Sequence, residues 1–126
     1  MTESQLTPVE HELMEILWAI KEGTVHDVMR QLPKDRKLAY TSVSTILRIL
    51  QQKKLLGIKK NGRTHIYQPL LSKENFAAHS VKKIVKQVFS GDTINLVAHL
   101  VNGELSLHDI NSIQALLDSK KKELSK

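Results

Sequence analysis

The chain has 126 residues, a formal net charge of +6 at pH 7 and no cysteine. The missing thiols exclude disulfides, thiolate zinc sites, iron–sulfur clusters and cysteine catalysis. No apolar run approaches the ~18 residues that a membrane span requires, and the first twelve residues lack the basic and apolar regions of a secretory signal. We therefore expect a cytoplasmic chain that does not insert into a membrane.

The positive charge is concentrated in one part of the chain. Residues 1–29 carry one cation and six carboxylates, residues 30–65 carry ten cations and one carboxylate, and residues 66–126 carry eight cations and six carboxylates. A run of cations is often only a solvated face, but this one falls on a predicted helix and hairpin. Cations clustered on one such unit indicate a polyanionic partner.

Two helices are predicted in the acidic segment. The first begins with a capping box at Thr7 and Glu10 and ends at Gly23. Its apolar stripe repeats with the helical period at Val9, Leu13, Ile16, Leu17 and Ile20. Thr24 caps a shorter second helix that ends before Pro33, and the residues next to Gly23 also have a weak tendency to form a third strand.

The third helix is predicted to begin near Tyr40 or Thr41 and has two different faces. Its apolar side would pack on the first two helices and consists of Val43, Ile46, Leu47 and Leu50. Its opposite side carries hydroxyls, amides and one guanidinium, from Thr41, Ser44, Thr45, Arg48, Gln51 and Gln52, with Ser42 and Ile49 at the margin. A polar face of this kind is suited to a DNA major groove.

Residues 56–60 and 64–68 are predicted to pair as a hairpin around Asn61-Gly62-Arg63. Asn-Gly favours a type I′ turn, in which both central residues have positive φ, and the loop has either two or three residues. A helix followed by a basic hairpin is the order of a winged helix-turn-helix, in which the hairpin, or wing, reaches the adjacent DNA backbone. We place this domain at residues 1–71.

If the domain is a winged helix, each polar residue of this region has an expected contact with DNA. Arg48 can reach guanine O6 and N7, while the hydroxyls before it can contact phosphates, bases or a thymine methyl. Lysines 53, 54, 59 and 60 and Arg63 suit phosphates, and Arg63 can also enter a minor groove. Tyr40 either packs the helix start or binds a phosphate. The expected DNA-binding set is Tyr40, Thr41, Ser42, Ser44, Thr45, Arg48, Gln52, Lys60, Asn61 and Arg63.

From residue 72 onward the sequence predicts three more helices. The first runs to about Ser90, the second ends at Val101, and Ser106 with Asp109 caps the last. We assign residues 72–126 to a C-terminal dimerisation domain, so that the whole chain is mainly α with a small antiparallel β wing.

Dimerisation is expected because three short helices cannot hide this much apolar surface by themselves. Burial stabilises by ~25 cal/mol per Å², and a second copy of the chain would cover the patch. Alternatively, these helices fold back on the first domain of the same chain. The residues expected in the dimer are Ile84, Val88, Phe89, Ile94, Val97, Leu100, Ile113 and Leu117.

The sequence shows no motif for catalysis or cofactor binding. The six histidines are scattered without a metal-ligand spacing, and no GxSxG, Walker or GxGxxG motif is present. Only five aromatic residues occur, which disfavours stacking platforms for single-stranded nucleic acid. We expect no catalytic residue, no cofactor and no metal site, and conclude that the chain is not an enzyme.

Several segments, which together span nearly the whole chain, resemble one known family. They are the Pro8-Val9-Glu10 opening, Leu17-Trp18, the run AYTSVSTILRIL, the wing NGRTHIYQPL and the segment VFSGDTINLVAHLV. In these segments the chain resembles the penicillinase repressors of the BlaI and MecI type, together with their copper-responsive CopY relatives. The resemblance implies a homodimeric repressor that binds an inverted repeat in double-stranded DNA and blocks transcription of resistance genes, such as a β-lactamase.

The resemblance also implies how such a repressor is released. In the best-known branch a membrane-embedded sensor protease triggers cleavage in the dimerisation region, at an Asn-Phe pair in the fifth helix. Here the corresponding place reads His99-Leu100, which makes these two residues the candidate cleavage site and a sensor protease a candidate partner. The copper-sensing branch uses a cysteine motif near its C-terminus, so this chain cannot sense copper in that way.

Two other functions fit the same sequence pattern. A winged helix can be a protein-interaction module whose basic face meets an acidic partner. It can also belong to a ligand-sensing regulator of the multidrug-resistance type, which needs a pocket between its DNA-binding and dimer regions. Nothing in the sequence marks such a pocket.

Overall fold

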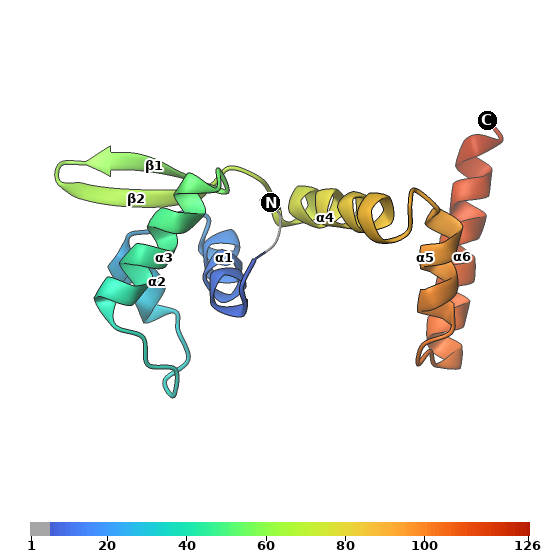
Figure 1. Ribbon diagram of the computed structural model, residues 1–126, viewed down its shortest axis with the longest axis horizontal. Helices are drawn as coiled ribbons and strands as arrows, with labels where there is room; N and C mark the ends of the chain where they lie inside the picture. The colour runs from blue at the N-terminus through green and yellow to red at the C-terminus, as the bar shows by residue number, and fades with distance from the viewer. Residues whose placement is uncertain (1–5) are drawn as a thin grey trace. The chain divides into compact units, whose positions relative to one another are not determined.

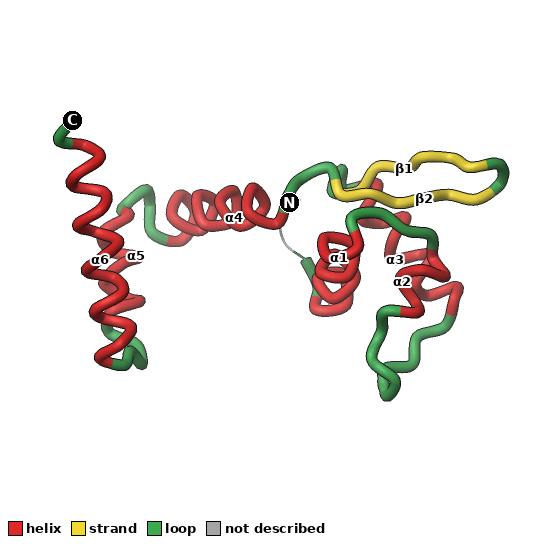
Figure 2. The backbone as a smooth tube through the Cα atoms, turned by 180° about the vertical axis from the view of Figure 1, so that it is seen from behind, coloured by secondary structure: helices red, strands yellow, loops and turns green. Residues whose placement is uncertain are grey.

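The computed structural model describes residues 6–126. Along the chain it has α1 (Pro8–Ile20), α2 (Val25–Arg30), α3 (Tyr40–Gln52), β1 (Leu56–Asn61), β2 (Thr64–Pro69), α4 (Lys73–Val88), α5 (Thr93–Val101) and α6 (Leu107–Leu124) (Figure 1). The strands form one antiparallel hairpin, drawn in yellow in Figure 2. The predicted fold class, mainly helical with a small antiparallel wing, is confirmed.

The chain divides into two compact units that meet inside α4, one up to Lys82 and the other from Lys83. The first unit is longer than the predicted domain 1–71 because the start of α4 packs on α1. The Trp18 indole N–H donates to the Leu71 carbonyl (2.9 Å), and its ring lies 5.5 Å from that of Phe76. Trp18 is therefore a packing residue that holds the beginning of α4.

The core of the first unit lies between its helices and the hairpin. Its fully buried side chains are Leu13, Met14, Leu17, Val28, Val43, Leu47, Leu50 and Leu56. The buried face of α1 is rotated about the helix axis relative to the predicted apolar stripe. Met14, which was not in that stripe, is buried, whereas Val9, Ile16 and Ile20 are only partly buried. The apolar side predicted for α3 is confirmed at Val43, Leu47 and Leu50, and Ile46 packs at its edge.

The hairpin has a two-residue loop. Asn61 pairs with Thr64 at the end of the ladder, so the loop is Gly62-Arg63. Gly62 has φ 66°, whereas Asn61 and Arg63 do not have positive φ. Positive φ at the first loop residue and not at the second is the pattern of a type II′ turn rather than the expected type I′.

The third strand that the sequence weakly suggested exists as a single bridge. The Gly23 N–H donates to the Tyr67 carbonyl (2.9 Å), and the Tyr67 N–H donates to the Gly23 carbonyl (2.8 Å). These two bonds fix the hairpin to the turn between α1 and α2. The position of the wing relative to the helices is thereby determined near its base.

The buried carboxylate of Glu10 joins α1 to α3. Glu10 is 6% exposed, and its Oε1 accepts hydrogen bonds from the Thr7 N–H (3.0 Å) and from the Lys53 ammonium (2.8 Å). Burial raises the pKa of Glu10, but the hydrogen bonds from Lys53 and Thr7 together with the Lys53 charge outweigh it, so the pKa is lowered overall. The capping box was predicted from the sequence, whereas the pairing with Lys53 was not.

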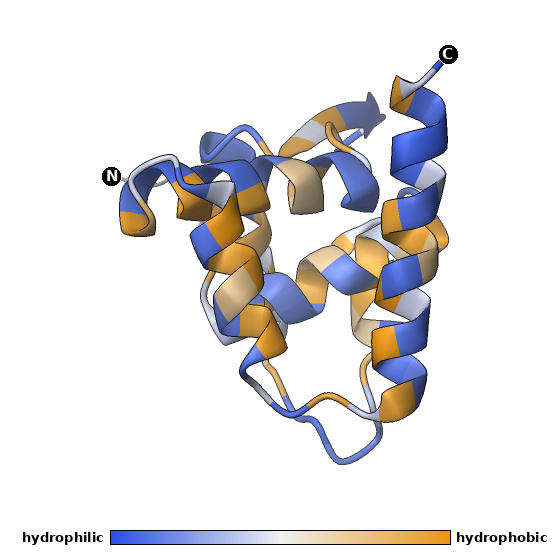
Figure 3. Cartoon of the chain, turned by 90° about the vertical axis from the view of Figure 1, so that its right-hand side faces the viewer, coloured by the Kyte–Doolittle hydropathy of each residue, from blue (hydrophilic) through white to orange (hydrophobic). Residues whose placement is uncertain are grey.

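The helices of the second unit are well capped but leave their apolar side chains open. Asp92 and Ser106 accept hydrogen bonds from the first turns of α5 and α6. None of the described residues of α4, α5 and α6 is buried, and Val88, Ile94 and Leu100 are 69%, 74% and 60% exposed. Figure 3 shows the apolar residues in orange along these helices. The helices of the second unit therefore do not cover this apolar surface by packing on one another.

No helix in the described range has the length and apolar character needed to cross a bilayer.

Replacing Glu10 with alanine should destabilise the first unit by about 1–2 kcal/mol at pH 7, because a capping box and a largely buried ion pair are both lost. The folded pKa of Glu10 lies below its unfolded value. Its contribution is thus complete above about pH 4.3 and disappears as the pH falls through the lowered folded value.

Urea unfolding followed by the fluorescence of Trp18, the single tryptophan of the chain, measures this effect, since Trp18 lies in the same helix as Glu10. The wild-type and Glu10→Ala curves should converge as the pH is lowered towards 3. Glu104→Ala, which removes an exposed carboxylate without an ion pair in the described range, is the matched control. An equal loss of stability in both variants would contradict the assignment.

Candidate nucleic-acid interface

The polar side of α3 faces solvent. Burial of Val43, Leu47 and Leu50 on the other side leaves six candidate residues exposed or half-buried on this one, namely Tyr40, Thr41, Ser44, Thr45, Arg48 and Gln52. Ser42, which was placed at the margin, is also exposed, whereas Gln51 is half-buried. A continuous strip of hydroxyl, amide and guanidinium groups is therefore accessible to a groove.

The first turn of α3 has open backbone donors. At the start of each of the five other helices, a side-chain oxygen accepts a hydrogen bond from a backbone N–H of the first turn. The accepting residues are Thr7, Thr24, Ser72, Asp92 and Ser106. Ala39 precedes α3 and provides no such bond, and the first turn of α3 has no acidic residue. The N–H groups and the positive end of the helix dipole thus stay available to an anion such as a phosphate.

Strand alternation separates the two lysines of β1. Lys60 lies opposite His65, and Ile58 lies opposite the buried Tyr67, so these four side chains share the face of the hairpin that continues from the core. Lys59 belongs to the other face, where its ammonium bonds to Glu22 (3.0 Å). Lys60 is therefore the better placed of the two for the strip on α3.

Ion pairs divide the cations of residues 30–65 into two groups. Four of them contact carboxylates of the acidic segment, in the pairs Arg30–Asp27, Arg36–Glu12, Lys53–Glu10 and Lys59–Glu22. Within residues 6–126 no ion pair is formed by Lys34, Lys37, Arg48, Lys54, Lys60 and Arg63. The sequence treated Lys53 as a phosphate contact, but its ammonium is held by Glu10 inside the fold. The unpaired charges remain on α3, its flanking loops and the wing.

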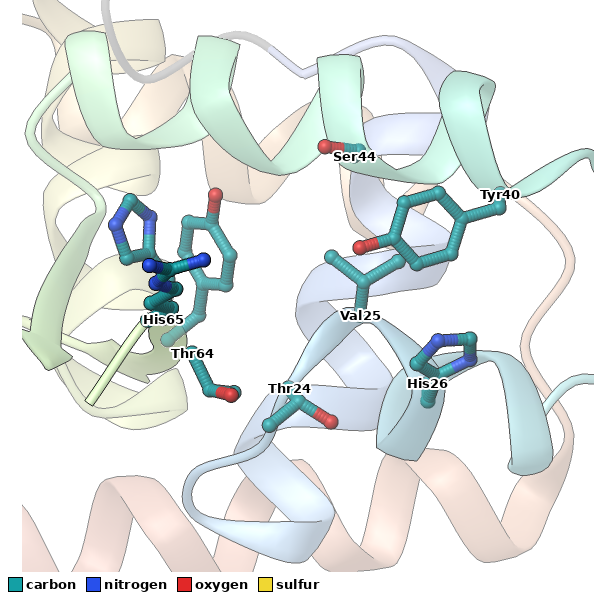
Figure 4. Close-up of a pocket in the computed structure, with 9 residues that line it drawn as sticks. Thr24, Val25, His26, Tyr40, Ser44, Thr64 and His65 are labelled. Carbon is teal, nitrogen blue, oxygen red and sulfur yellow. The ribbon is translucent and has the colours of Figure 1, made fainter. Parts of the chain in front are cut away.

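A hollow of about 370 Å³ lies between α3 and the hairpin, next to the start of α2 (Figure 4). It is lined by Thr24, Val25, His26, Tyr40, Ser44, Arg63, Thr64, His65 and Tyr67. Burial raises the pKa of the Tyr67 phenol, the nearby Arg48 guanidinium lowers it in part, and Tyr40 adds to the rise. Tyr67 therefore presents a neutral hydroxyl at the inner wall.

Besides Tyr67, four polar residues of this hollow were not among the expected DNA-binding set: Thr24, His26, Thr64 and His65. His65 was detectable in principle, because strand alternation puts it on the same face as Tyr67. His26 was not, since only the fold brings the start of α2 to the wing. Its ring lies 4.9 Å from that of Tyr40, so Tyr40 packs at the helix start while it stays 46% exposed.

The described residues contain no group of three or more His, Asp or Glu side chains placed to hold a metal ion.

Comparison with known proteins identifies the family. A family model described as the penicillinase repressor matches residues 6–119. The chain belongs to the penicillinase repressor family. The family resemblance found in the sequence is therefore confirmed, and the chain is a DNA-binding transcriptional repressor of this family.

Individual members of the family differ in how much of the chain they match. The penicillinase repressor of Bacillus licheniformis is 24% identical over 118 residues, 93% of this chain and 92% of that protein. The transcriptional regulator BlaI of Mycobacterium tuberculosis is 34% identical over 76 residues, 60% of this chain and 55% of that protein. The solution structure of the DNA binding domain of the repressor BlaI shares the fold, with a TM-score of 0.52, 24% identity and coverage of 59% of this chain and 90% of that one.

Arg48→Ala should weaken binding to the preferred DNA site by ~1–3 kcal/mol and relax the preference at one base pair per half-site, because a bidentate contact to guanine is lost. Lys60→Ala should instead weaken binding to all duplexes by the same factor, because Lys60 is expected to contact phosphate. Competition binding with a set of single-base variants of the site separates the two. Lys122→Ala on α6 is the control and should change neither quantity.

If Arg48→Ala lowers the affinity for every duplex equally, Arg48 contacts phosphate and the assignment to a base is wrong.

Proposed function

We propose that this repressor binds an inverted repeat in double-stranded DNA as a homodimer. Each protomer places the exposed strip of α3 in the major groove and rests its wing on the neighbouring backbone. The observation that carries the proposal is the combination of that strip with Arg48, Lys60 and Arg63, which form no ion pair within residues 6–126. Base edges would be read by the strip, and the affinity would come largely from phosphates.

The homodimer is supported by the uncovered side chains of the second unit. Among the eight residues expected in the dimer, Phe89 and Ile113 are half-buried and the others are exposed: Ile84, Val88, Ile94, Val97, Leu100 and Leu117. A second copy of α4, α5 and α6 would remove this surface from water and hold two winged helices for two half-sites.

The regulated genes and the release step are inferred by analogy with the family. The relative from Bacillus licheniformis is named a penicillinase repressor, so we infer control of a β-lactamase or a similar antibiotic-resistance gene, exerted in the cytoplasm. Release by cleavage at His99-Leu100 is compatible with α5, a helix of 9 residues. This helix has no buried residue to resist local unfolding, and Leu100 is 60% exposed. A membrane sensor protease would provide the signal.

The affinity for the operator should depend steeply on salt. If a dimer engages about eight phosphates, a fourfold increase in salt should weaken binding by about four orders of magnitude. Genomic footprinting with the purified chain would first locate the bound repeats, and titrations of that site at several salt concentrations would give the slope.

Competition with heparin distinguishes this proposal from a basic protein-interaction module. Heparin should displace the chain from random duplex much more readily than from the operator. An operator affinity that does not change with salt, or equal displacement from both duplexes, would contradict DNA binding as the function.

A chain ending at Lys82 should be a monomer that binds half-sites but has poor affinity for the full operator, because two half-sites are no longer held together. Cutting after Lys82 rather than before Lys73 keeps Phe76 on Trp18 and the Lys73–Glu15 pair (2.9 Å). Sedimentation analysis and operator titrations measure the two properties. Unchanged operator affinity in this shortened chain would rule out the dimer.

A further inference from the structure

The hollow between α3 and the hairpin is lined by groups that can donate hydrogen bonds. Its polar lining consists of hydroxyls, two imidazoles and the Arg63 guanidinium, and it contains no carboxylate. Figure 4 shows His26 and His65 on different sides of the space, with Ser44 on α3 and the Tyr40 hydroxyl directed towards its interior. All of these groups can donate a hydrogen bond, and a phosphate oxygen only accepts.

No carboxylate of the described residues lines the hollow together with His26 and His65. On its own helix, His26 is followed by Asp27, which is bound to Arg30 and accepts from the Thr24 N–H (2.9 Å), a hydrogen bond that lowers the pKa of Asp27. Tyr40 faces His26 from α3, and the hairpin contributes Arg63 and Tyr67. The Asp27 carboxylate is therefore already engaged.

The surroundings of His65 are positive as well. Lys60 lies directly opposite it on β1, and Arg63 lines the same hollow. Both His26 and His65 are exposed, so a ligand can reach them without a change in the fold. An anion bound in the hollow would be a partner for a protonated imidazole at either place.

We propose that this hollow binds the sugar–phosphate backbone of the duplex, and that His26 and His65 contact its phosphates in their protonated form. The inference rests on the proposed function and adds two residues to the DNA-binding set. The hollow continues directly into that set, because Tyr40, Ser44 and Arg63 belong to both. A volume of about 370 Å³ accommodates a phosphodiester with its sugar.

Protonation of these histidines makes DNA binding depend on pH. Histidine gains its charge between pH 8 and pH 5, and a neighbouring phosphate favours the charged form. Binding therefore takes up protons, and the affinity rises as the pH falls. Each phosphate that an imidazolium neutralises also adds about 0.9 to the slope of log K against log salt, at pH 6 but not at pH 8.

The test compares the full-length wild type, the double variant His26→Gln/His65→Gln and the control His108→Gln, whose histidine is exposed on α6. Operator affinity should rise at least about tenfold from pH 8 to pH 6 in the wild type and in the control. The double variant should lose most of this rise and have a shallower salt slope at pH 6. Glutamine keeps a donor and removes the charge, and circular dichroism verifies the fold.

A second measurement distinguishes DNA from free phosphate. Imidazole proton resonances of His26 and His65 should shift on addition of the duplex half-site at pH 6, and should not shift with inorganic phosphate at the same concentration. Saturation by inorganic phosphate would mean a site for small anions and would overturn the inference.

The inference and the proposed function fail in different ways. If the double variant keeps the wild-type response to pH while Arg48→Ala still weakens operator binding, the inference is wrong and the proposed function stands. If no variant and no pH gives specific duplex binding, the proposed function itself is contradicted.

Discussion

The interface depends on how α3 is anchored in the core of the first unit. Val43, Leu47 and Leu50 are fully buried, and each contributes about 1.5–3 kcal/mol through the removal of apolar surface from water. Because these residues recur with the helical period, their burial fixes the rotation of α3 about its axis. The polar strip on the opposite side is then held towards solvent, and any rotation that hid it would expose the apolar side.

The acidic N-terminal segment has a structural role in shaping the basic surface. Its carboxylates pair with four cations that lie behind or beside the interface, of which Lys53 is largely buried. Among the cations of residues 30–65, those that keep no carboxylate partner in the described range lie on α3, its flanking loops and the wing. Residues 30–65, which carry ten cations and one carboxylate, thus present positive charge where a polyanion would approach, which strengthens both attraction and orientation.

The second unit has the opposite character, since it satisfies its helix ends but not its apolar side chains. The caps at Asp92 and Ser106 stabilise each helix locally. Val88, Ile94 and Leu100 stay largely exposed, although a folded chain normally buries such residues. Pairing with a second copy of the chain would bury these side chains. Such pairing would also link dimerisation to the binding of two half-sites.

The sequence by itself determined the features that depend on local order: the caps at Thr7, Thr24 and Ser106, the two faces of α3 and the existence of the hairpin. These follow from hydrogen bonds within a few residues or from the period of apolar positions. Tertiary structure alone decided the partner of Lys53, the loop type at Gly62 and the approach of His26 to the wing. Such contacts join residues that are distant in the chain, or depend on the twist of paired strands, and no local pattern records which distant groups meet.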